Sequence, residues 1–130
     1  MANLDWNQFL GWSKDQMNEL RFAGFSFLRQ GKYDKALSFF NALVIIDSNH
    51  YDLQTLGAIH LQTGNAQDAI HWLDQAISLE PNNEISLLNK AKALFMVHKK
   101  QEALLVARKL IPSHNRTIAS DAQALIIAYS

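Results

Sequence analysis

Three small residues near the start of this chain recur 33 positions further along it. The two sets are Gly24, Gly31 and Ala36, then Gly57, Gly64 and Ala69. A third, weaker copy follows after a 34-residue step, with Ala91 and Ala103 at the positions of Gly57 and Ala69. A fixed period of about 20–50 residues indicates a repeat architecture. The chain is therefore expected to stack similar units side by side.

Each copy has the spacing of two amphipathic helices. Before Gly64 the spacing i, i+3, i+4, i+7 and i+8 is occupied by Leu53, Leu56, Gly57, His60 and Leu61. After it the spacing i, i+3, i+4 and i+7 is occupied by Ala66, Ala69, Ile70 and Leu73, and glycine is a residue type that favours a turn after a helix. Pro81 and Pro112 end the second and third copies, because the residue before a proline leaves the helical conformation. The pattern predicts helices over residues 5–12, 15–30, 33–46, 50–63, 66–79, 84–97, 100–110 and 117–129.

The small residues have a packing reason. Two helices can cross closely only where one side chain is nearly absent, and large neighbours then fill the flanks. The small positions are Gly24, Gly57 and Ala91 on the first helix of each copy and Ala36, Ala69 and Ala103 on the second. We expect these residues to define the fold and to carry no chemistry.

Composition excludes several classes of function. Lys plus Arg equals Asp plus Glu, at 12 each, so no global charge draws the chain to nucleic acid or to a membrane surface. The chain has no cysteine, no visible secretory signal and no apolar run of 18 residues. Its five histidines are scattered, and it has no phosphate-binding loop or nucleophile motif. We expect no catalytic residue, no metal, no cofactor and no enzyme activity.

The pattern resembles the tetratricopeptide repeat, a helix–turn–helix unit of 34 residues. The second copy carries the landmark residues of that family at Leu53, Gly57, Gly64, Ala69 and Pro81. The third copy is degenerate, since His98 replaces the turn glycine. The resemblance implies one all-α domain over 1–130, a right-handed superhelix of three repeats at about 17–49, 50–83 and 84–115. An N-terminal extension, 1–16, and a C-terminal capping helix, 117–129, flank these repeats.

A narrower resemblance lies in the first repeat. The run from Phe27 to Ala36, FLRQGKYDKA, followed by Phe40, Leu43 and Asp47, is similar to the first repeat of class II type III secretion chaperones of bacteria. Those are small cytosolic proteins that bind translocator or needle subunits before export. The resemblance implies a cytoplasmic chaperone with a protein client. The alternative is a general scaffold or assembly module of a multiprotein complex.

The family resemblance also implies where a partner binds. In tetratricopeptide proteins, the first helix of each repeat lines a concave groove. The positions that face this groove are occupied here by Arg21, Phe22, Phe25, Leu28, Arg29, Tyr51, Gln54, Ala58, Leu61, Ile85, Leu88, Asn89, Lys92, Phe95 and Met96. Because most of them are apolar, we expect the groove to hold an extended or helical hydrophobic segment of a client.

A second interpretation of these residues is that they pack within the chain. The chain's own N-terminal or C-terminal helix would then fill the groove. We expect Phe22, Phe25 and Phe95 to be open to a partner. For Leu28 and its equivalents Leu61 and Leu88, a place in the core between repeats is equally compatible with the sequence.

Two further features concern partners. Trp6, Phe9, Leu10 and Trp12 form an apolar set that we expect to pack as a lid on the first repeat, and the alternative is a homodimer contact or a second partner site. Tetratricopeptide domains that hold the carboxylate tail of heat-shock chaperones use Lys and Asn in the groove. Here the corresponding positions include Phe25 and Ile85, with Arg21 and Asn89 as the polar ones, so that function is disfavoured.

Overall fold

The computed structural model describes residues 13–130, and every regular element in that range is a helix. The lid predicted from residues 1–12 lies outside the described residues. The bounds are α2 (Lys14–Arg29), α3 (Tyr33–Ile46), α4 (His50–Gln62), α5 (Ala66–Leu79), α6 (Glu84–Met96), α7 (Lys100–Lys109) and α8 (Arg116–Tyr129). The all-α class predicted from the repeat pattern is confirmed. The division into one domain with the stated repeat limits stays a prediction.

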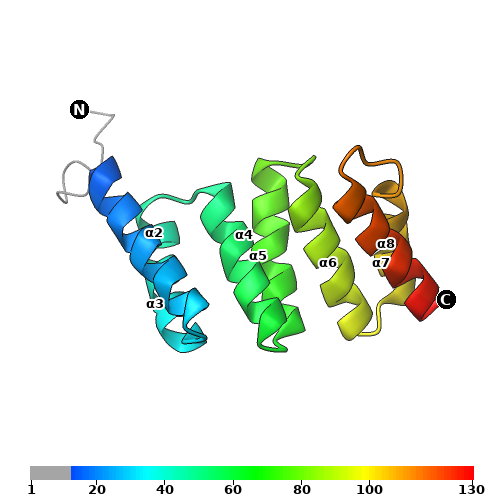
Figure 1. Cartoon of the computed structure of the whole chain (residues 1–130), viewed down its shortest axis with the longest axis horizontal. Helices are drawn as coiled ribbons and strands as arrows, with labels where there is room; N and C mark the ends of the chain where they lie inside the picture. Colours follow the sequence, from blue (N-terminus) through cyan, green and yellow to red (C-terminus); the bar gives the residue numbers. More distant parts are fainter. Residues whose placement is uncertain (1–12) are drawn as a thin grey trace.

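The helices form two rows. Helices α2, α4, α6 and α8 follow one another in the first row, and α3, α5 and α7 lie beside them in the second (Figure 1). Each hairpin packs against the next one through α3 with α4 and through α5 with α6. Helix α8 has no second helix of its own in the described chain, and it packs against α6 and α7. The first row thus continues for one helix beyond the third hairpin.

Local sequence explains where the helices begin and turn. Ser13 starts α2 with a capping box, in which its hydroxyl accepts from the amide of Gln16 while the Gln16 side chain accepts from the amide of Ser13. Asn side chains cap α4, α6 and α8 in a similar way. The turns inside the hairpins need a left-handed residue, with φ of 73° at Gly31, 83° at Gly64 and 64° at His98.

Close helix crossings occur where the sequence places its small residues. A Cβ added to Gly24 would lie 2.8 Å from Cε2 of Phe40, and one added to Gly57 would lie 2.5 Å from Cγ of Leu73. Ala91, at the equivalent position of the third copy, is fully buried. The predicted packing role is confirmed at Gly24 and Gly57, because no side chain fits there without moving a neighbour, and the burial of Ala91 agrees with it.

Candidate protein-binding groove

A groove of about 390 Å³ opens on the first row of helices. Helix α2 and the start of α3 form one wall, α4 forms the floor, and α6 supplies the far edge. The lining residues are Phe25, Leu28, Tyr33, Gln54, Thr55, Ala58, Ile59, Gln62, Ile85 and Asn89. Six of these ten were predicted as groove residues from the sequence: Phe25, Leu28, Gln54, Ala58, Ile85 and Asn89. The groove is mainly apolar, with amide and hydroxyl groups among its lining residues.

Large apolar side chains are exposed on the same helices. The exposed fraction is 70% for Phe22, 38% for Phe25, 61% for Tyr51, 49% for Ile85 and 42% for Met96. All five belong to the predicted set. Exposed apolar surface of this kind is typical of a site that binds another molecule. Phe25 also contacts the core, because its ring packs edge-on against Phe40 with centroids 5.0 Å apart.

The expectation that Phe95 is open to a partner is wrong. Its side chain is 3% exposed, and its ring stacks on Tyr129 of α8 with centroids 4.3 Å apart and an interplanar angle of 13°. Leu88 is also buried, in a cluster with Leu110 and Ile118. The physical reason is the position of α8, which packs against α6 and covers this part of the first row. The chain's own C-terminal helix therefore closes the third-repeat end.

The remaining predicted residues divide between core and surface. Leu28 is half-buried against the cluster around Phe40, and Leu61 is half-buried against the cluster around Leu73. Arg29 is exposed, with its guanidinium carbon 5.9 Å from the centroid of the Phe22 ring. Lys92 is half-buried on α6. Met96 lines a second hollow of about 520 Å³ together with Phe95, His98, Lys100 and Tyr129.

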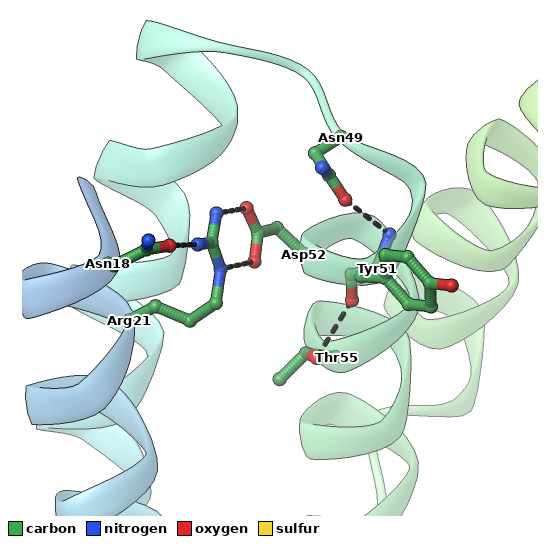
Figure 2. A network of polar contacts seen from close by, with 6 residues as sticks. All are labelled: Asn18, Arg21, Asn49, Tyr51, Asp52 and Thr55. Atoms are coloured by element: carbon green, nitrogen blue, oxygen red, sulfur yellow. Dashed lines mark hydrogen bonds and ion pairs between the residues drawn. The ribbon is translucent and has the colours of Figure 1, made fainter. Parts of the chain in front are cut away.

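Arg21, the third predicted cation of the groove, is bound within the chain. Its Nε donates to Oδ1 of Asp52 and its Nη2 donates to Oδ2, both at 2.7 Å, and Nη1 donates to Oδ1 of Asn18 at 2.7 Å (Figure 2). The Asp52 side chain is 1% exposed. A buried carboxylate requires such a partner, and the planar guanidinium supplies two parallel hydrogen bonds. Arg21 thus joins α2 to α4.

The same contacts fix the charge of Arg21. Its hydrogen bond with Asp52 raises the pKa of Arg21, partial burial lowers it, and the charges of Asp52 and Asp47 add to the rise. Since the folded pKa is raised, the stabilisation from this charge is fully present below the ordinary arginine pKa. It is lost only as the pH rises through the higher folded value. The guanidinium therefore stays charged at every pH near neutrality.

The neighbouring junction carries a matching link at the same repeat positions. Ser86 donates through Oγ to Oε1 of Gln54 at 3.0 Å, and this bond joins α4 to α6. Gln54 follows Arg21 by 33 residues, and Ser86 follows Asp52 by 34. Asp52 and Ser86 are the two buried polar side chains of the described core. Sequence reasoning missed both, although a polar residue recurring at one repeat position beside buried leucines was a visible signal.

The described residues offer little for metal or acid–base chemistry. Within 13–130, no group of three or more His, Asp or Glu side chains gathers in a way that could hold a metal ion. Asp52 is the buried carboxylate, and Arg21 holds both of its oxygens. In the same range no helix is both long enough and apolar enough to cross a bilayer. The groove remains the feature that needs a functional explanation.

Solved structures share the fold over almost the whole chain. The translocator chaperone SycD of Yersinia enterocolitica type III secretion is 21% identical, with a TM-score of 0.83 over 97% of this chain and 98% of that chain. PcrH, in complex with the chaperone binding region of PopD, is 22% identical, with a TM-score of 0.76 over 90% and 92%. The first tetratricopeptide domain of Spaghetti (RPAP3), bound to an HSP90 peptide, is 17% identical, with a TM-score of 0.78 over 89% and 94%.

Sequence comparison gives the family. No curated protein sequence matches this chain significantly. A family model does match, and its description is anaphase-promoting complex, cyclosome, subunit 3. The match extends over residues 29–110, from the end of α2 to the end of α7, which is more than half of the chain. The protein therefore belongs to this family of tetratricopeptide-type helical repeats, and its fold is that of the type III secretion chaperones SycD and PcrH.

Proposed function

We propose that this protein is a cytoplasmic chaperone of a bacterial type III secretion subunit, a translocator or needle component. It holds a hydrophobic segment of that client in the groove between α2, α4 and α6. The observation that carries the proposal is the row of exposed apolar side chains on the first helices, with Phe25 and Ile85 at the edges of a groove of about 390 Å³. Covering a client's apolar segment there would keep it from aggregating before export.

The available apolar surface is sufficient for a stable complex. Burying one large apolar side chain contributes roughly 1.5–3 kcal/mol. Phe22, Phe25, Tyr51 and Ile85 are partly covered already, so each supplies less than that range. Client side chains are buried at the same time, and the sum exceeds the association penalty of at least about 4 kcal/mol. The structural resemblance to PcrH, which was solved with a region of PopD, supports the same mode of use.

The groove is poorly suited to an anionic C-terminal tail. A carboxylate needs free cationic or amide donors on the floor of its site. Phe25 and Ile85 supply apolar surface at the two positions where tail-binding domains have polar donors, and Arg21 is held by Asp52. We therefore propose an apolar internal segment as the ligand, although RPAP3 binds an HSP90 peptide with a similar fold.

A second candidate function is that of a scaffold or assembly module. The observation that favours it is the family match, because the matching model is described as a subunit of a multiprotein complex. A scaffold would bind folded partners and would leave client solubility unchanged. Neither proposed function includes catalysis.

Co-expression with a candidate translocator or needle subunit tests the chaperone proposal. We expect the soluble fraction of the subunit to rise when the wild-type chain is present. Phe25→Glu and Ile85→Glu should each abolish this effect, because a carboxylate would lie in an apolar groove. Leu105→Glu is the matched control, since Leu105 is exposed on α7 in the second row of helices.

Two outcomes contradict the proposal. If the soluble fraction of every candidate subunit is unchanged, the chaperone function fails. If binding is retained by both groove variants, the site is elsewhere. Partners that bind without any change in client solubility would support the scaffold function. Circular dichroism of each variant shows that the fold is retained.

A further inference from the structure

The two junctions along the first row differ in spacing. Helix α4 packs closely against α6 but only marginally against α2, and α3 packs less extensively on α4 than α5 packs on α6. The groove is lined by α2 on one side of the wider junction and by α4 on the other. The separation of α2 and α4 therefore determines how much space a client finds.

The polar link at the wider junction is also the longer of the two. Arg21 and Asp52 cross the wider junction, and Gln54 and Ser86 cross the narrower one at the same repeat positions. Arginine Nε and glutamine Oε1 lie the same number of bonds from Cα, arginine Nη2 lies two bonds further, and aspartate is one atom longer than serine. The longer pair thus spans the larger gap, and Figure 2 shows the guanidinium held between Asn18 on α2 and Asp52 on α4.

We propose that the Arg21–Asp52 pair is the spacer that sets the opening between α2 and α4, and with it the width of the client groove. Arg21 is then a positioning residue and makes no contact with the client. Its guanidinium is fixed by three hydrogen bonds of 2.7 Å, so the side chain is not free to turn toward a ligand. The spacing claim stands on the free protein, whereas its effect on binding rests on the proposed chaperone function.

An apolar contact provides the competing explanation. Ile59 is buried at the first junction, and the smaller Ala93 occupies the equivalent position at the second. The bulk of Ile59 alone could hold α4 away from α2. The two explanations make different predictions for a variant that keeps Ile59 and shortens the polar pair.

The decisive variant carries Arg21→Gln together with Asp52→Ser. These two substitutions place the residue pair of the second junction, glutamine and serine, at the first junction. Spin labels measure the result, because the natural chain has no cysteine to interfere. Labels at Phe22→Cys and Tyr51→Cys report the first junction, and labels at Tyr51→Cys and Ile85→Cys report the second. All three native residues are exposed, and none of them is hydrogen-bonded through its side chain to either polar link. We expect the first distance to shorten by roughly 1.5 Å, the length of the one bond by which the Nε–Oδ1 link exceeds the Oε1–Oγ link, and the second to stay unchanged.

Binding gives the second readout in unlabelled protein. The probe is the secretion subunit that the wild-type chain keeps soluble. The double variant should bind it at least about tenfold more weakly, while its midpoint of thermal unfolding falls less than that of Arg21→Gln alone, since no buried charge is left unpaired. Arg21→Lys, which keeps the charge and most of the length, should give an intermediate affinity.

The outcomes separate the two proposals. An unchanged distance between α2 and α4 overturns the spacer and assigns the separation to Ile59. A shortened distance with unchanged affinity shows a spacer that does not control the groove, and it overturns the inference about binding. If no subunit is solubilised by the wild-type chain, the chaperone function fails, and the distance measurement still decides the role of the pair.

Discussion

The two ends of the first helix row solve the same packing problem in different ways. At the α2–α4 junction, a buried carboxylate and a guanidinium bridge two helices that leave a groove between them. At the α6–α8 junction, Phe95 stacks on Tyr129 and apolar clusters fill the space. Closure of an apolar surface by the chain itself gives stability, whereas an incomplete closure leaves surface for a partner. The contrast supports our proposal that a partner binds in the groove between α2, α4 and α6.

The largest expected effect on stability comes from replacing a phenylalanine by alanine at the closed end, compared with the same replacement at the open end. Phe95→Ala should lower the free energy of unfolding by about 3–5 kcal/mol, because it empties a buried site under α8. Phe22→Ala, at a side chain that is 70% exposed, should change it by less than about 0.5 kcal/mol. Urea denaturation measures both. Equal effects of the two substitutions would remove the distinction between a closed and an open end.

Removing the arginine of the polar junction should have the next largest effect. Arg21→Ala leaves the carboxylate of Asp52 buried without its partner, which costs about 3 kcal/mol. Adding Asp52→Ala to that variant should recover part of the loss, since the unpaired charge disappears. Thermal unfolding of the single and double variants forms the test. If Arg21→Ala has no effect, water or another group already satisfies Asp52.

The neutral link at the second junction should matter less. Gln54→Ala removes the oxygen that accepts a hydrogen bond from the hydroxyl of Ser86, and this bond is worth about 1 kcal/mol. Amide exchange along α4 and α6 would show where the stack loosens. A loss as large as that of Arg21→Ala would mean that the charge of the first link contributes nothing beyond the hydrogen bond.

The smallest expected effect is a gain at the closed end. His98 has a φ of 64° where the first two hairpins place glycine. His98→Gly should raise the free energy of unfolding by about 0.5–1 kcal/mol, because the left-handed conformation is strained for a residue with a Cβ. Gly64→Ala should act in the opposite direction by about 1 kcal/mol. A loss of stability in His98→Gly would show that the imidazole makes a contact that outweighs the strain.

The repeat register made most of the fold predictable. Periodic small residues indicate both the helices and their crossings, and the predicted ranges 33–46 and 66–79 coincide with α3 and α5. The open part of the groove was predictable too, because Phe25 and Ala58 share one repeat position and Tyr51 and Ile85 share another. The register carries this information because each hairpin contacts mainly its neighbours.

Two features could not be predicted from the repeat register. The burial of Phe95 depends on α8, which follows Pro112 outside the 34-residue period, so no repeat position predicts what α8 covers. The pairing of Arg21 with Asp52 depends on how far apart α2 and α4 lie. A sequence period fixes which residues are equivalent, but it does not give the distance between successive helices.

The cap at Ser13 has a practical consequence for anyone who modifies this protein. The side chains of Ser13 and Gln16 accept from each other's amides, so these two amides at the start of α2 have their partners within the helix itself. A fluorescent reporter or an affinity handle joined ahead of residue 13 is therefore expected to leave the first hairpin folded. Such a reporter would lie at the end of the helix row that begins with α2.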